Sequence, residues 1–151
     1  MLIERADPTQ PAVRALLAEL DGYLHFLYPP SSNYILDPAQ LQGLDVTFLV
    51  AREGEDLLGC VALRSCAGYG EVKRMMVSPR ARGKGLGRAL LNALEQHAVA
   101  QGIPVLRLET GIHQPDAIRL YHANGFTDIS HFGNYPDDPL SRFMEKSLAG
   151  R

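Results

Sequence analysis

The sequence predicts an α/β fold in which helices flank one mixed, mostly antiparallel sheet. Apolar side chains recur at three- and four-residue steps in two long stretches, which is the period of an amphipathic helix. Between these stretches, three strand-like runs follow one another through short turns, which favours antiparallel pairing. The expected order is β-α-α-β-β-β-α-β-α-β-β. No repeat or long linker divides it, so residues 1–151 are expected to form one domain.

The first half of the chain contains a strand, two helices and the three consecutive strands. A strand over residues 3–6 is followed at Asp7-Pro8 by a helix that runs to Tyr28. The prolines and serines of residues 29–33 break this helix, and a short second helix is expected around residues 38–42. The three strands are expected over residues 46–52, 57–66 and 71–77.

In the second half, helices and strands alternate. A helix is expected from Leu86 to about Gly102, a strand over 105–109 and a helix over 115–123. Two strands then begin at Phe126 and at Phe143. Cys60 and Cys66 fall in one predicted strand, about 20 Å apart if extended, so they cannot form a disulfide with each other.

Composition excludes several classes of protein. With 151 residues, 46% hydrophobic residues and only 2 cysteines, the chain is expected to fold around an apolar core rather than a disulfide scaffold. It has no run of apolar residues that would span a membrane and no apolar leader, so a cytoplasmic location without a membrane partner is expected. A net charge of -2 argues against nucleic-acid binding.

Positive charge is nevertheless concentrated in one segment. Six of the 15 basic residues lie between residues 73 and 88, with no acidic residue among them: Lys73, Arg74, Arg80, Arg82, Lys84 and Arg88. The segment leads from a strand through glycines at 83, 85 and 87 into a helix. Glycine lets main chain approach a ligand closely, and a helix N-terminus favours anions, so this segment is expected to bind phosphate groups.

Two common phosphate-binding motifs do not fit this loop. A P-loop needs Ser or Thr after Gly-Lys, but Gly85 follows Gly83-Lys84. A dinucleotide fingerprint that starts at Gly83 meets Arg88 where glycine is required, and one that starts at Gly85 meets Leu90.

The loop instead resembles the pyrophosphate-binding motif of the GNAT acetyltransferases. Residues 82–87 read R-x-x-G-x-G, and residues 117–126 read A-x-x-x-Y-x-x-x-G-F, as in that superfamily. The Glu-Thr-Gly stretch at 109–111 further resembles small stand-alone bacterial members. The resemblance implies an acetyl-CoA-dependent enzyme that acetylates a primary amine by direct attack in a ternary complex. The acceptor is expected to be a small, amino-acid-like molecule, and a homodimer is a further expectation. Alternatives are a protein or peptide amine as acceptor, or a non-catalytic CoA-binding regulatory domain.

The resemblance also implies roles for particular residues. The main chain of Met75 and Val77 would pair with the pantetheine arm, and Gln114 stands where the family often has an asparagine that contacts the cofactor. Tyr121 matches the general acid that protonates the leaving thiolate, and Glu71 matches a general base. The pyrophosphate would be bound by Arg82, Gly83, Lys84, Gly85, Leu86, Gly87 and Arg88.

Structural alternatives remain open for several of these residues. Tyr121 would also fit a core position, and Glu71 would equally pair with Arg64 or Lys73. Residues proposed to meet the acceptor are Tyr28, Arg74 and Tyr135, with Tyr23, His25 and Tyr34 either lining the same pocket or packing. The five histidines lack metal-ligand spacing, so no metal site is expected.

Overall fold

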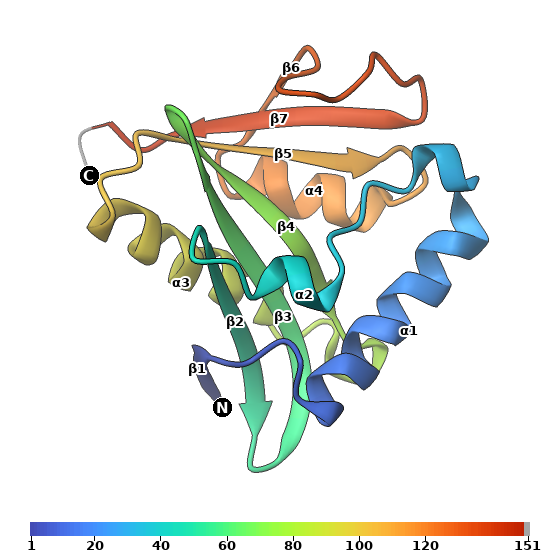
Figure 1. The fold of residues 1–151 in the computed structure, drawn as a ribbon, viewed down its shortest axis with the longest axis vertical. Helices are drawn as coiled ribbons and strands as arrows, with labels where there is room; N and C mark the ends of the chain where they lie inside the picture. Colours follow the sequence, from blue (N-terminus) through green and yellow to red (C-terminus); the bar gives the residue numbers. More distant parts are fainter. Residues whose placement is uncertain (150–151) are drawn as a thin grey trace.

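The computed structural model describes residues 1–149 and has the predicted α/β architecture and element order (Figure 1). One seven-stranded sheet has the order β1-β2-β3-β4-β5-β7-β6. Its strands are β1 (Leu2–Arg5), β2 (Val46–Glu53), β3 (Asp56–Cys66), β4 (Tyr69–Val77), β5 (Val105–Gly111), β6 (Thr127–Ile129) and β7 (Ser141–Ser147). All neighbours pair antiparallel except β4 and β5, which are parallel.

Helices cover both faces of the sheet. The helices are α1 (Pro11–Leu27), α2 (Pro38–Leu41), α3 (Leu86–Ala100) and α4 (Pro115–Ala123), with short 3-10 turns at Pro30–Ser32 and Pro79–Ala81. Figure 1 shows α1 and α2 in front of the sheet and α3 behind it. The central strands are therefore apolar on both sides: Leu49 packs in the core with α3 and α4, whereas Phe48 packs in the core with α1 and α2.

Several element boundaries differ from the prediction, and three of these differences have a cause in hydrogen bonding or packing. Helix α1 begins at Pro11, because the Asp7 carboxylate accepts hydrogen bonds from the main chain and hydroxyl of Thr9 and forms a turn there. The strand after Phe126 has only the three residues of β6, since the chain then turns so that its aromatic side chains pack on β7. Strand β7 begins at Ser141, where it pairs with the last residue of β5.

The parallel pair β4–β5 separates part-way along, and this separation positions the site. The two strands pair only over residues 70–72 and 106–108. Beyond that point β4 contains a bulge, in which Arg74, with a φ of 56°, and Met75 together lie opposite Val61 of β3. The thiol of Cys60 donates to the Arg74 carbonyl at 3.1 Å, and burial raises the pKa of Cys60 to about 12. The bulge leaves residues 73–77 at an open edge that faces α4.

Candidate active site

A groove of about 390 Å³ follows the open edge of β4 and continues to the first turn of α3. It is lined by main chain and side chains of β4, the glycine-rich loop and α4: Leu20, Tyr23, Met75, Met76, Val77, Ala81, Arg82, Gly83, Gly85, Leu86, Gly87, Arg88, Gln114, Pro115, Asp116, Ala117 and Leu120. Of the residues predicted to bind the cofactor, only Lys84 is not among them; its side chain is exposed beside the groove.

The glycine-rich loop presents unused hydrogen-bond donors to this groove. Among residues 1–149, the main-chain N–H groups of residues 83–88 find no acceptor, and α3 has no side-chain cap. Gly83 and Gly85 have φ values of 79° and 74°, a conformation that glycine adopts without strain. Consecutive free N–H groups at a helix N-terminus stabilise an anion, and Arg82 and Arg88 add positive charge. The loop thus fits a pyrophosphate.

Gly87 has a different role from the other two glycines of the loop. A Cβ atom at this position would lie 2.9 Å from Cδ2 of Leu120, a residue of α4. The absence of a side chain therefore lets the first turn of α3 approach α4 closely, and the two helix N-terminal regions flank one groove.

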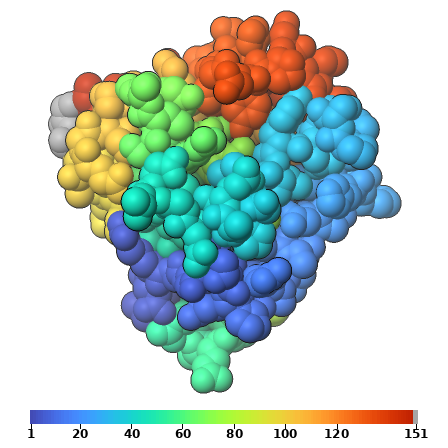
Figure 2. Space-filling model, viewed as in Figure 1, coloured from blue at the N-terminus to red at the C-terminus, as the bar shows by residue number. Residues whose placement is uncertain are grey.

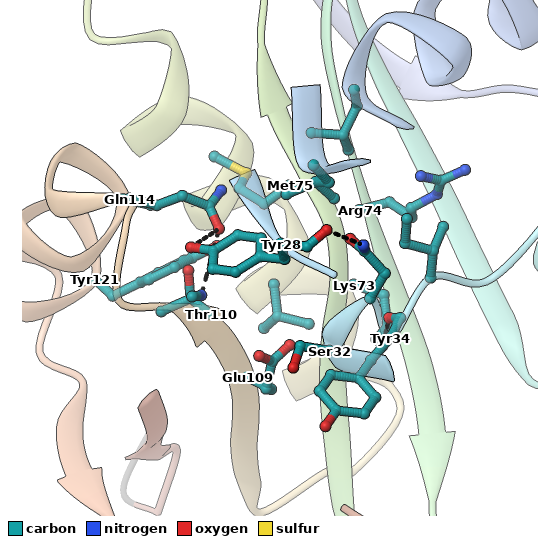
Figure 3. A pocket seen from close by; sticks show the side chains of 17 residues that line it. Tyr28, Ser32, Tyr34, Lys73, Arg74, Met75, Glu109, Thr110, Gln114 and Tyr121 are labelled. Atoms are coloured by element: carbon teal, nitrogen blue, oxygen red, sulfur yellow. Dashed lines mark hydrogen bonds between the residues drawn. The ribbon is translucent and has the colours of Figure 1, made fainter. Parts of the chain in front are cut away.

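A second, smaller cavity of about 90 Å³ lies at the point where β4 and β5 separate (Figure 3). It shares Leu20, Met75, Gln114 and Ala117 with the groove, so the two are contiguous. Its remaining lining comes from α1, the segment after it, β4, β5 and α4: Leu24, Tyr28, Ser32, Asn33, Tyr34, Ile35, Val72, Lys73, Arg74, Glu109, Thr110, Gly111 and Tyr121.

Tyr121 projects from α4 into the wall of this cavity. Its side chain is 5% exposed, and burial, followed by the charge of Glu109, raises the pKa of its phenol. Within the described residues its hydroxyl has no hydrogen-bond partner. Tyr121 is thus held protonated, with a donor available to a bound molecule.

Tyr28 is fixed against the end of β5. Its hydroxyl accepts from the main-chain N–H of His113 at 3.0 Å and donates to Oε1 of Gln114 at 3.3 Å. A Cβ on Gly111 would lie 1.8 Å from that hydroxyl, so only glycine leaves room for the tyrosine ring. Gln114 also accepts from the Gly111 N–H, which places its side chain at the junction of the groove and the cavity.

Arg74 and Tyr135, both predicted to meet the acceptor, are engaged elsewhere. Arg74 borders the cavity, but its guanidinium forms a bidentate ion pair with Asp21 of α1. One of the two hydrogen bonds joins Nη2 of Arg74 to Oδ2 of Asp21 at 3.4 Å. Tyr135 does not line the cavity. The hydroxyl of Tyr135 accepts a hydrogen bond from the Lys73 ammonium and donates one to the Glu71 carboxylate.

Glu71 is buried and does not line the cavity either. Its side chain accepts from Tyr135, and Oε2 lies 3.7 Å from the ammonium of Lys73. Of the two partners that the sequence left open for Glu71, Arg64 and Lys73, the structure thus shows Lys73. Glu71 is connected to the cavity through Lys73 and Tyr135.

Two charged cavity residues were missed as site residues from the sequence, Lys73 and Glu109. Burial raises the pKa of Glu109, and Ser141 donates to its Oε2 at 2.7 Å. The available signal was alternation: Glu71 and Lys73 flank the apolar Val72 on β4, and Arg107 and Glu109 flank the apolar Leu108 on β5. The parallel register, in which Glu71 pairs with Arg107, brings these charges to one face of the sheet.

Two segments distant in sequence close the cavity on its outer side. Asp138 accepts hydrogen bonds of 2.7 Å from Ser32 and from Tyr34. Figure 2 shows the corresponding surfaces in contact, with the segment after α1 in light blue against the C-terminal loop in orange-red. These bonds hold residues 32–34 over the cavity.

Residues 1–149 contain no group of three or more His, Cys, Asp and Glu side chains that could hold a metal ion. Within the same residues, no helix is long and apolar enough to cross a membrane.

Comparison with known proteins identifies the class. The family model of the acetyltransferase (GNAT) family matches residues 13–126. An IAA acetyltransferase of Azospirillum brasilense is 50% identical over 148 residues, 97% of each chain. The crystal structure of a Klebsiella pneumoniae protein assigned to the acyl-CoA N-acyltransferases has a TM-score of 0.83 and 40% identity and covers 97% of each chain.

A more distant structure shares the fold. The PaiA N-acetyltransferase of Thermoplasma acidophilum, solved with coenzyme A, has a TM-score of 0.74 at 21% identity and covers 98% of this chain and all of its own. The chain therefore belongs to the GNAT family of acetyltransferases and is an N-acetyltransferase.

Proposed function

We propose that this enzyme transfers an acetyl group from acetyl-CoA to the primary amine of a small molecule, by direct attack in a ternary complex. The proposal rests on the junction of a groove that presents free N–H donors with a smaller, partly covered cavity, with Tyr121 beside the junction. When bound, acetyl-CoA would supply an activated thioester. The free N–H groups of residues 83–88 would hold its pyrophosphate, and the open edge of β4 at Met75 and Val77 would hold its pantetheine arm.

Each remaining step has a residue suited to it. Tyr121, protonated and with a free donor, gives its proton to the departing thiolate. Main-chain N–H groups at the bulge near Met75 are proposed to stabilise the oxyanion. Glu109, whose carboxylate opens to the cavity, takes the proton of the acceptor ammonium; Glu71 reaches the cavity only through Lys73 and Tyr135.

Direct attack and a small acceptor both have support in the geometry. Neither cysteine lines the groove or the cavity, so no thiol of the described chain is placed to accept the acetyl group first. The cavity has a volume of about 90 Å³ and is partly covered by residues 32–34, which favours a small acceptor over a peptide. A homodimer, expected from the family resemblance, is kept as part of the proposal.

The proposal is tested by incubating the enzyme with acetyl-CoA and a panel of primary amines while free thiol is followed. We expect thiol release that depends on the amine, and a mass increase of one acetyl group on that amine. Binding of CoA without turnover of any amine would contradict the proposed function and support a regulatory CoA-binding domain. Acetylation of peptides but of no small amine would contradict the acceptor class.

A further inference from the structure

The acceptor cavity carries partly buried charges of opposite sign on two different strands. Lys73 projects from β4 with a side chain 10% exposed, and Glu109 projects from β5. Both side chains line the same cavity (Figure 3). Buried charges are costly unless they are paired or hydrogen-bonded, so a bound molecule that completes the hydrogen bonds of both groups is favoured.

Lys73 retains one unused donor. Its ammonium donates to the carbonyl of Tyr34 at 2.9 Å and to the hydroxyl of Tyr135 at 2.8 Å. Glu71 Oε2, at 3.7 Å, is too far for a third hydrogen bond. Because an ammonium has three N–H donors, one remains without an acceptor among the described residues. Burial lowers the pKa of Lys73, and the charges of Glu71 and Glu109 oppose this.

Glu109 has an unused hydrogen-bond acceptor, which complements the unused donor of Lys73. Oε2 accepts from Ser141, whereas Oε1 has no partner among residues 1–149 and is not fully buried. Oε1 can therefore accept a hydrogen bond from an ammonium in the cavity.

Arg74, the other cation that borders the cavity, is not available to bind an anion there. Two of its nitrogens pair with Asp21, and its Nε, although without a partner in the described chain, is fully buried. Lys73 is therefore the cavity cation with a donor to offer.

Resting on the proposed amine acetylation, we propose that the acceptor carries a carboxylate as well as the amine, as an amino acid does. Lys73 binds the carboxylate, and Glu109 binds the ammonium and then takes its proton. The two groups belong to one molecule because the cavity of about 90 Å³ holds only one small acceptor. In this arrangement each buried charge of the cavity meets a ligand group of opposite sign.

The first test uses the wild-type enzyme and needs no variant. Initial rates with acetyl-CoA are measured for L-amino acids, for their carboxamides and for the corresponding decarboxylated amines. For at least one amino acid we expect kcat/KM to exceed that of its carboxamide and its decarboxylated amine by about tenfold or more, as for loss of a charge-assisted hydrogen bond. Turnover of carboxamides or simple amines as fast as any amino acid would overturn the inference and leave the proposed function intact. Absence of turnover with every amine would overturn both.

A second test assigns the preference to Lys73. Lys73→Met keeps an unbranched side chain but removes the charge, so the ratio between amino acid and carboxamide is expected to fall to near unity, chiefly through a higher KM for the amino acid. Arg64→Gln is the matched control, because Arg64 is an exposed cation paired with Asp45 at 3.5 Å and lies outside the cavity. An unchanged ratio in folded Lys73→Met would overturn the role of Lys73. If that variant does not fold, the wild-type comparison decides.

Discussion

At the scale of single residues, burial and orientation separate two neighbouring carboxylates. Glu71 accepts a hydrogen bond from Tyr135 and faces Lys73, outside the cavity lining. Glu109 lines the cavity with an oxygen to spare, and burial raises the pKa of its carboxyl. A general base must reach the proton that it removes and works best with a pKa near the working pH. The first condition favours Glu109 over Glu71, and the raised pKa of the Glu109 carboxyl suits the second.

This assignment predicts the pH dependence of the rate. A carboxyl with a raised pKa becomes charged only as the pH rises through that higher value, so wild-type kcat/KM should fall as the pH is lowered through it. Glu109→Gln should lower kcat/KM by about 10²-fold and remove this fall at low pH, which is the acidic limb of the pH profile. Glu71→Gln, the matched control, should retain the limb. Loss of the limb in Glu71→Gln alone would identify Glu71 as the base, acting through Tyr135 and Lys73.

The sequence was informative for residues within motifs and uninformative for those outside them. Tyr121, Gln114 and Tyr28 lie at the cavity, where the patterns and the family resemblance place cofactor and acceptor. Lys73 and Glu109 lie outside the two matched motifs at residues 82–87 and 117–126, and their proximity is created by the parallel register of β4 and β5. Long-range register is not encoded in local residue spacing, so these two site residues emerge only from the structure.

At the scale of elements, the N-terminus of α3 and the bulge of β4 create one groove. The bulge turns residues 73–77 away from β5, and the loop that follows leaves the N–H groups of residues 83–88 free. The loop, with its glycines and helix, was predictable because glycine placement and basic charge are local features. Local residue spacing did not predict the bulge, since it depends on Val61 of the facing strand.

The groove predicts unequal effects for two cations of the same loop. Arg82 lines the groove, whereas Lys84 is exposed beside it. Arg82→Gln should weaken CoA binding by about tenfold, as expected for loss of a charge-assisted hydrogen bond. Lys84→Gln should have a smaller effect that disappears at high salt, because only screened, long-range attraction is lost. Isothermal titration of both variants with CoA at two salt concentrations measures this. An equal loss in the two variants would contradict direct contact by Arg82.

At the scale of the whole molecule, charge and topology are arranged around the junction of groove and cavity. The net charge of -2 conceals a basic loop at one end of the groove. The outer side of the cavity at the other end is covered where Ser32 and Tyr34 bind Asp138, which lies more than 100 positions later in the chain. The order of elements could be predicted from periodicity and turns. The contact of Ser32 and Tyr34 with Asp138 could not be predicted, because it joins the segment after α1, which includes a 3-10 turn, to a loop far along the chain.

Acetyl transfer is proposed to occur at this junction, with Tyr121 as the proton donor. The most direct test compares kcat and CoA affinity in wild type and Tyr121→Phe, a change that removes only the hydroxyl from a buried ring. We predict that kcat falls by about 10²-fold or more while the Kd for CoA is unchanged. A variant that turns over at the wild-type rate would contradict the claim.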